Sequence, residues 1–216
     1  VVESSDTDTT PHDYGTYASS TTYISGNAVK NAAEDITERI KYWAQKMLEA
    51  PEGNFELKDG KVVNTGTGDA VTLEEIGYES IYGEDEREHI MGQGHFSTDI
   101  SPTPYGVQFV DVTVDDQTGE FEINKLLQAM DVGTAIDPGM AEGQIEGSEM
   151  MALEYATEEL LTFDEDGNPD VQGYRDYGMP RATDMPEMET ILVEPHDPTG
   201  PFGAKSVGEV PVNPLP

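Results

Sequence analysis

The sequence predicts an α+β fold in which antiparallel hairpin sheets pack against amphipathic helices. Two long stretches with apolar residues at intervals of three and four predict the helices, and β-rich runs around short turns predict the hairpins. At 216 residues with 36% apolar content, the chain is long enough to bury a core. We expect one domain over residues 1–216, or two smaller parts divided into residues 1–103 and 104–216.

The first half of the chain contains a long helix, a hairpin and a short helix. The long helix is predicted over residues 25–49, where apolar side chains recur on one face. Residues 55–63 alternate in polarity around an Asp-Gly pair, which is typical of a hairpin. Thr72, with a glutamate three positions later, predicts a capped helix start. The turn-rich residues 83–104 are expected to form a surface connection.

The second half repeats this combination of hairpins and a helix. Residues 106–114 and 120–130 predict a long antiparallel hairpin, and a second helix is predicted over residues 140–159. A third hairpin is expected to begin at residues 160–163, and a final strand is predicted at 189–194. The side chains expected on the buried face of the second helix are Ile145, Ser148, Met151, Ala152 and Tyr155.

The charge of the chain is strongly unbalanced, with 44 acidic and 11 basic residues and a formal net charge of −33. Such a chain repels itself unless dissolved salt screens the charges. The acidic residues are spread along the whole sequence, which indicates a surface adapted to the cytoplasm of a salt-adapted organism. The same charge argues against nucleic acid or an anionic membrane as a partner.

The chain contains no cysteine, which excludes disulfides, thiolate zinc sites and cysteine-ligated iron-sulfur clusters within it. No window approaches the roughly 20 apolar residues that a membrane span requires. The sequence begins as if inside a strand and stops where a helix is expected to follow, so we expect it to be part of a longer protein.

Three segments combine small and polar residues beside predicted elements: the loop 15–22, the helix entry 142–147 and the C-terminal segment 203–209. Each has an ordinary structural explanation, such as a helix cap or an exposed turn. Each could equally line the pocket of an anionic cofactor, because small residues let backbone N–H groups approach phosphate and pterin. Composition alone leaves both explanations open.

The order of three longer motifs along the chain, and their amino-acid sequences, favour the cofactor-pocket explanation. Residues 16–29 (TYASSTTYISGNAV), residues 131–138 (DVGTAIDP) leading into 142–147 (EGQIEG), and residues 201–209 (PFGAKSVGE) carry the likeness. In this order they resemble the final third of the molybdopterin-binding subunits of the xanthine dehydrogenase and aldehyde oxidase family of molybdenum hydroxylases. The resemblance extends over essentially the whole chain and implies the second half of a molybdenum cofactor-binding domain.

The resemblance implies a role for particular residues. Glu209 takes the position of the catalytic base, and the backbone at Ala18 takes the position nearest the molybdenum, with no protein side chain bound to the metal. Many relatives carry arginine where this chain has Ser20, so that contact is weaker here or uses the backbone alone. The residues expected to contact the cofactor are Ala18, Ser19, Ser20, Thr21, Gln144, Lys205, Ser206 and Val207.

The resemblance also implies a reaction and partners. The reaction is hydroxylation of an electron-poor carbon in a purine- or xanthine-like heterocycle, or of an aldehyde. The cofactor is molybdenum–molybdopterin, with its cytosine dinucleotide form left open. Iron-sulfur clusters and FAD are expected in an iron-sulfur subunit and a flavin subunit, and the rest of the molybdopterin subunit is a further partner. We expect this chain alone to be inactive.

Two other functions are alternatives for so acidic a chain. A non-catalytic acidic scaffold or interaction domain of a halophile could keep the fold, but it would be free to lose Glu209 and Gln144, and both are present. A calcium-binding acidic module would require complete ligand loops. The acidic turn at residues 164–168 lacks the distal bidentate glutamate of such a loop, so we interpret it as a solvated turn.

Overall fold

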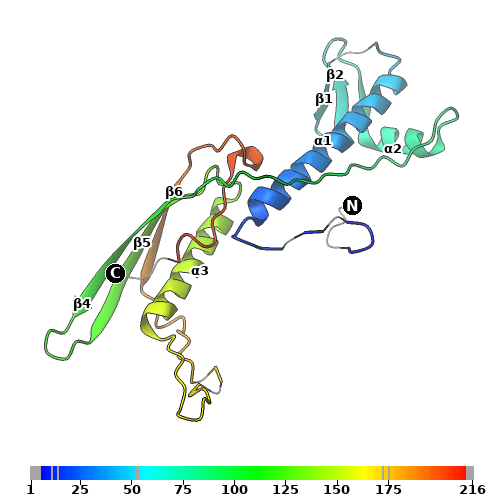
Figure 1. The fold of residues 1–216 in the computed structure, drawn as a ribbon. Helices are drawn as coiled ribbons and strands as arrows, with labels where there is room; N and C mark the ends of the chain where they lie inside the picture. The colour runs from blue at the N-terminus through cyan, green and yellow to red at the C-terminus, as the bar shows by residue number, and fades with distance from the viewer. Residues whose placement is uncertain are drawn as a thin grey trace. The chain divides into compact units, whose positions relative to one another are not determined.

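The computed structural model of the chain describes residues 6–10, 12–13, 15–51, 54–171, 173–174 and 176–212. The described residues form two compact units, one within residues 1–12 and 24–98 and the other within residues 13–23 and 99–216. Helix α1 (Thr21–Met47) begins in the second unit and continues through the first (Figure 1). It starts four residues earlier than predicted. Tyr23 in its first turn is buried, with its hydroxyl 2.8 Å from Thr199 Oγ1, and this distant contact anchors the additional turn.

The first unit packs α1 against a small antiparallel sheet and helix α2 (Leu73–Tyr82). The sheet has the order β1 (Phe55–Lys58), β2 (Lys61–Asn64) and β3 (Ala70–Thr72). The predicted hairpin and capped helix are confirmed, while β3 was not predicted. The buried residues of the core are Trp43, Ala44, Val62, Val71 and Ile76.

Helix α2 begins with the predicted capping box. The hydroxyl of Thr72 accepts a hydrogen bond from the Glu75 backbone N–H at 3.1 Å, and the Glu75 carboxylate accepts one from the Thr72 N–H at 2.8 Å. The carboxylate also accepts a hydrogen bond from the Thr72 hydroxyl at 2.7 Å, and the bonds from the Thr72 N–H and hydroxyl lower the pKa of Glu75. The cap satisfies two backbone donors that would otherwise lack a partner at the helix start.

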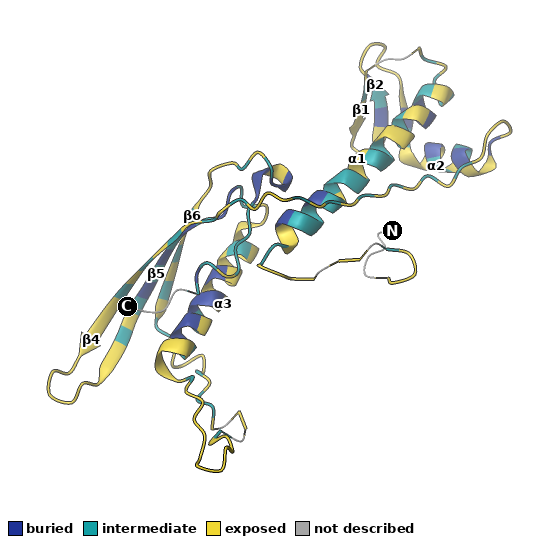
Figure 2. Ribbon diagram, viewed as in Figure 1, coloured by how far each residue is buried: buried dark blue, intermediate teal, exposed yellow. Residues whose placement is uncertain are grey.

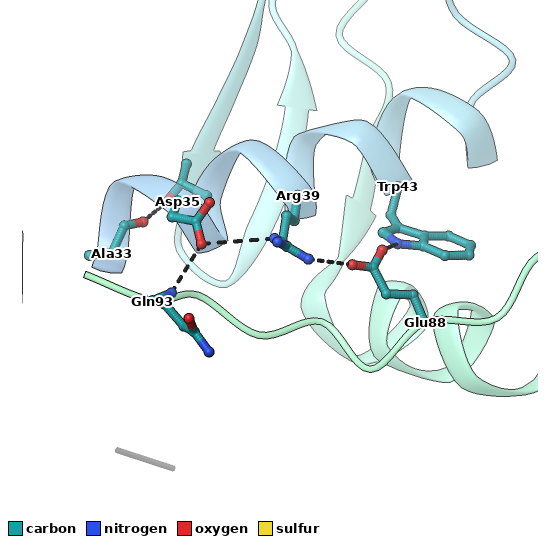
Figure 3. A network of polar contacts seen from close by, with 7 residues as sticks. Ala33, Asp35, Arg39, Trp43, Glu88 and Gln93 are labelled. Atoms are coloured by element: carbon teal, nitrogen blue, oxygen red, sulfur yellow. Dashed lines mark hydrogen bonds and ion pairs between the residues drawn. The ribbon is translucent and has the colours of Figure 1, made fainter. Parts of the chain in front are cut away.

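An extended segment after α2 lies along α1 and is fastened by side chains (Figure 3). The Glu88 carboxylate accepts hydrogen bonds from Arg39 Nη1 at 2.6 Å and from Trp43 Nε1 at 3.1 Å. Farther along, Asp35 accepts one from the backbone N–H of Gln93 at 3.0 Å. The close approach requires a glycine, because a Cβ at Gly94 would overlap backbone atoms of α1.

The second unit contains a three-stranded sheet with α3 (Pro138–Thr157) over one face (Figure 1). Its order is β4 (Gly106–Val114), β5 (Phe121–Asp131) and β6 (Glu187–Val193). The β4–β5 hairpin is confirmed. However, β6 pairs with β5 in parallel, so the sheet is not purely antiparallel as predicted. The helix between β5 and β6 provides the crossover that a parallel pair requires.

The segment predicted as a third hairpin forms no strand within the described residues. Only an isolated bridge joins Phe163 and Pro169, and the side chain of Asp164 closes the turn by accepting hydrogen bonds from Asp166 N at 2.9 Å and Asn168 N at 2.8 Å. The Asn168 side-chain amide, which donates to Asp164 Oδ2 at 3.0 Å, contributes most to lowering the pKa of Asp164, and the backbone contacts add to it. The apolar residues before the turn are exposed and reach no sheet, so alternation alone does not produce a strand here.

Helix α3 buries a different stripe from the predicted one. Ile145, Ser148 and Ala152 are buried as expected, but Met151 and Tyr155 are exposed by 46% and 59%. Glu149 and Leu153 complete the stripe instead. Glu149 was not among the residues predicted for this face, although it is fully buried. Figure 2 shows buried positions along this helix and along β5.

Glu149 faces a polar row across the inner side of the sheet. Gln108, Gln128 and Thr190 are paired in register on the three strands, and polar atoms of all three side chains are buried without a hydrogen-bond partner in the described chain. Burial is the largest cause that raises the pKa of Glu149, to about 7. The Gln108 amide partly offsets the rise without reaching full hydrogen-bond geometry, and the Glu146 carboxylate adds to it.

This raised pKa predicts a pH-dependent stability. Between pH 4.5 and 7 the folded protein keeps a proton on Glu149 that the unfolded chain releases, so stability decreases as pH rises through that window. Glu149→Gln removes the ionisation cost, and its stability advantage over the wild type is expected to grow by roughly 2.5 kcal/mol from pH 5 to pH 8. Urea unfolding of the assembled protein at fixed salt measures it. The exposed control Glu122→Gln should show no such gain, and equal effects of Glu149→Gln at both pH values would contradict the prediction.

Candidate cofactor site

The C-terminal loop of the second unit returns to the end of β5. After β6, the 3₁₀ turn Pro201–Gly203 leads into an antiparallel bridge between Ala204 and Gly133. The Thr134 N–H donates to the Gly203 carbonyl at 2.7 Å, and the Lys205 N–H donates to the Val132 carbonyl at 2.9 Å. The segment 203–205 is therefore held as a short strand-like addition beside residues 132–134.

The turn before this loop is organised by Asp197. One carboxylate oxygen accepts hydrogen bonds from the Thr199 hydroxyl at 2.6 Å, the Thr199 N–H at 2.8 Å and the Gly200 N–H at 3.1 Å. The Thr199 hydroxyl contributes most to lowering the pKa of Asp197. Because the Tyr23 hydroxyl donates to Thr199, the first turn of α1 is joined to the same turn.

The three polar segments singled out in the sequence meet at Gly208. The Ser148 hydroxyl of α3 donates to the Gly208 carbonyl, or alternatively to the Gln144 carbonyl one turn earlier. A Cβ on Gly208 would come within 2.9 Å of Ser19 Oγ and 3.5 Å of Gln144 Oε1. The loop before α1, the helix entry and the C-terminal motif therefore form one surface.

The loop before α1 has an unusual backbone at the residues predicted to approach the cofactor. Ala18 and Ser19 adopt φ angles of 50° and 51°, and the Ser20 N–H donates to the Tyr17 carbonyl at 3.0 Å. These are features of a type I′ turn, which glycine or asparagine normally occupies. Each such residue costs on the order of 1 kcal/mol, and strain of this kind occurs at ligand sites. Within the described residues, the N–H groups of Ala18 and Ser19 donate to no other group of the chain.

The predicted site residues differ in their exposure to solvent and in the groups that they contact. Glu209 and Gln144 are exposed, and Ser206 is half-buried. Val207 packs against the buried cluster of Met130, Val132 and Ile145. The Lys205 ammonium is turned toward Asp131 Oδ2 at 2.7 Å and the Thr103 carbonyl at 3.3 Å. The positive charge of Lys205 is therefore paired with the Asp131 carboxylate within the chain.

This surface fits a polar, anionic cofactor. It offers the backbone N–H groups of Ala18 and Ser19, which have no partner among the described residues, the exposed Gln144 amide, and a glycine that leaves room beside them. Among the described residues there is no cluster of three or more histidine, cysteine or acidic side chains spaced to hold a metal ion. No helix in the described part of the chain is long and apolar enough to cross a membrane.

Comparison with known proteins identifies the family. The model of the molybdopterin cofactor-binding domain matches residues 1–186. The chain belongs to this family. The resemblance that the motifs predicted is thereby confirmed, and so is the α+β class. The PFGAKSVGE motif lies beyond the residues that the family model matches. It is included in the alignment with the XdhA relative, which covers 100% of this chain.

The relatives of this molybdopterin cofactor-binding domain are much longer proteins. The probable hypoxanthine oxidase XdhD of Escherichia coli is 36% identical over 98% of this chain, which spans 22% of that protein. The putative xanthine dehydrogenase molybdenum-binding subunit XdhA of the same species is 31% identical over 100% of this chain and 29% of its own length. The reconstituted CO dehydrogenase of Oligotropha carboxidovorans superimposes with a TM-score of 0.85 at 29% identity, covering 95% of this chain and 26% of that one.

The contacts that hold the loop of this domain were not predicted from the sequence. They are the hydrogen bond of Ser148 to Gly208, the turn around Asp197 and the ion pair of Asp131 with Lys205. For the ion pair, the sequence signal was limited to the presence of Lys205 and Asp131 in two motifs of the same family. Nothing in either motif indicates that the two side chains meet.

Proposed function

We propose that this domain forms one wall of the cofactor pocket in a molybdenum hydroxylase, with Glu209 as the base. The observation that carries the proposal is the convergence of Ser19, Gln144 and Gly208 directly before Glu209. When bound, molybdenum–molybdopterin supplies the two-electron oxidation of the substrate. The backbone at Ala18 and the Ser19 hydroxyl orient the cofactor, and the Gln144 amide hydrogen-bonds it. Ser20 and Thr21, whose hydroxyls donate to Tyr17 O and Thr16 Oγ1, contact it less directly.

The substrate that we propose is a purine- or xanthine-like heterocycle, with an aldehyde as the second choice. The printed names of the two Escherichia coli relatives support the first class. Glu209 accepts a proton from the water that supplies the new oxygen atom, and this requires a carboxylate within hydrogen-bond reach of the reacting group. Electrons leave through iron-sulfur clusters and FAD in partner chains, and the cofactor is molybdopterin or its cytosine dinucleotide.

An isotope experiment tests the reaction class. The assembled enzyme, with its molybdenum content measured, is incubated in ¹⁸O-labelled water with hypoxanthine, xanthine or an aromatic aldehyde and an electron acceptor. We expect the hydroxylated purine to carry ¹⁸O. Oxygen derived from O₂ would overturn the reaction class, and labelled product from the aldehyde alone would overturn the purine assignment.

We also propose that the outer face of the β4–β5–β6 sheet contacts the remaining part of the molybdopterin subunit. Val107, Ala129 and Ile191 form a registered apolar row across the three strands on the side away from α3. The flanking Phe109 and Val193 are exposed by 62% and 46%. Contiguous apolar surface on so acidic a chain is typical of a protein interface. The iron-sulfur and flavin chains then complete the complex in the cytoplasm.

The acidic surface is proposed as an adaptation to salt, which predicts salt-dependent stability. At a net charge of −33, lowering NaCl from 2 M to 0.05 M is expected to cost about 2 kcal/mol or more, since repulsion is then poorly screened. The unfolding free energy of the assembled protein at fixed pH measures the effect. NaCl is preferred to sulfate because sulfate strengthens apolar burial by itself. Unchanged stability across the series would rule out the adaptation.

A further inference from the structure

We propose that the buried ion pair of Lys205 and Asp131 is a clamp that positions the loop leading to Glu209. Lys205 is therefore a positioning residue that acts on the cofactor site through the backbone, and its ammonium does not contact the cofactor. The inference deepens the proposed function and rests on it.

Both partners of the pair are enclosed and fully engaged. Lys205 Nζ lies 2.7 Å from Asp131 Oδ2, and the two side chains are only 11% and 12% exposed. The ammonium also donates to the Thr103 carbonyl at 3.3 Å, while Asp131 Oδ1 accepts from the Gly133 N–H at 3.1 Å. Removing either partner would leave the other side chain enclosed without its ion-pair partner, which is strongly unfavourable, so each partner holds the other in place.

The clamp fixes the Lys205 end of the short segment 205–208, and a separate contact fixes the Gly208 end. The Lys205 N–H donates to the Val132 carbonyl at 2.9 Å, so main chain and side chain of Lys205 are both tied to the end of β5. The other end is Gly208, whose carbonyl accepts from the Ser148 hydroxyl. Only residues 206 and 207 lie between these anchors, and Glu209 follows the second one directly. A shift at Lys205 therefore moves the loop that presents Glu209.

The experiment compares the two single variants with the double variant in the assembled, molybdenum-loaded enzyme. We expect Lys205→Met and Asp131→Asn each to lower kcat per molybdenum about tenfold or more, with KM changed less than about threefold, because a misplaced base slows chemistry more than binding. The double variant should be no slower than the singles, because all three lose the same anchor. Lys46→Met is the matched control, since that lysine also joins two segments through an ion pair, with Glu86, but it is partly exposed and lies in the first unit.

A second measurement is independent of turnover. In the cofactor-free enzyme, hydrogen exchange of the peptide 203–209 is expected to accelerate about tenfold in both single variants, while a peptide within 121–130 stays unchanged. Where a neutral variant fails to fold, Lys205→Arg and Asp131→Glu retain the charges and alter only the reach. They should bind molybdenum normally and lose about threefold to tenfold in kcat.

The alternatives give different results. Direct contact between Lys205 and the cofactor predicts near-normal kcat for Asp131→Asn with loss confined to the lysine variants, and this would overturn the clamp. Lower melting temperature with unchanged kcat per molybdenum and unchanged exchange in 203–209 would also overturn it. Failure of the proposed function is distinguishable, because the wild-type enzyme itself would then lack molybdenum or hydroxylation.

Discussion

Replacement of Glu209 by glutamine is expected to lower turnover of the assembled enzyme by about 10²- to 10⁴-fold while leaving its molybdenum content unchanged. Glutamine keeps the size and hydrogen-bonding reach of the side chain but cannot accept the proton. The position tolerates the change, because Glu209 is exposed and neither of its carboxylate oxygens is buried without a hydrogen-bond partner. The loss should therefore appear in kcat and not in stability.

The measurement combines steady-state kinetics with metal analysis on the same preparation. Glu122→Gln is the matched control, because it makes the same chemical change at an exposed glutamate on β5, outside the segments of the candidate site, and should retain full activity. Turnover of Glu209→Gln within a few-fold of the wild type would refute the assignment of the base. Loss of molybdenum together with activity would assign Glu209 to cofactor binding instead.

Local sequence signals were sufficient for elements whose stability is local. The Asp-Gly pair and the alternation around it predicted the β1–β2 hairpin, because the turn residues and the strand period specify the same register. The Thr72 and Glu75 side chains predicted the start of α2, because a capping box is complete within four residues. The β4–β5 hairpin likewise connects adjacent segments.

Elements that depend on distant partners were less predictable. The parallel pairing of β6 with β5 joins segments about sixty residues apart, and no local pattern distinguishes it from another hairpin edge. Glu149 was not among the residues predicted on the buried face of α3, although the polar row on the sheet lies against it and burial raises its pKa to about 7. In both cases the tertiary context outweighs the local preference.

The sequence indicated which segments form the candidate site but not the contacts that join them. The family motifs identified residues 16–29, 131–147 and 201–209 as the segments concerned. They did not indicate that Ser148 holds Gly208, or that the Lys205 charge is consumed by Asp131. Such contacts join residues 60 and 74 positions apart, and a single sequence carries no information on which of the many acidic residues a lysine meets.

Substitution of Gly133 by alanine is expected to destabilise the second unit by about 4 kcal/mol or more and to release the C-terminal loop. Gly133 has φ of 63° and lies against residues 203–205. An added Cβ would overlap the Gly203 carbonyl oxygen and come within 2.9 Å of the Lys205 nitrogen. These are backbone atoms that cannot move aside as a flexible side chain can, so the bridge to Ala204 must open. Urea unfolding and the molybdenum content of the assembled enzyme measure the two consequences.

Gly119→Ala separates this steric effect from backbone strain. Gly119 also has a left-handed φ, 79°, but a Cβ there meets nothing within 4 Å. The control should therefore lose only about 1 kcal/mol, the ordinary cost of alanine in that conformation, and keep its molybdenum. The difference between the two variants measures how much the approach of residues 203–205 to Gly133 contributes. If Gly133→Ala cost no more than Gly119→Ala, the loop would not be held against β5 as the structure describes, and the clamp formed by Lys205 would lose its basis.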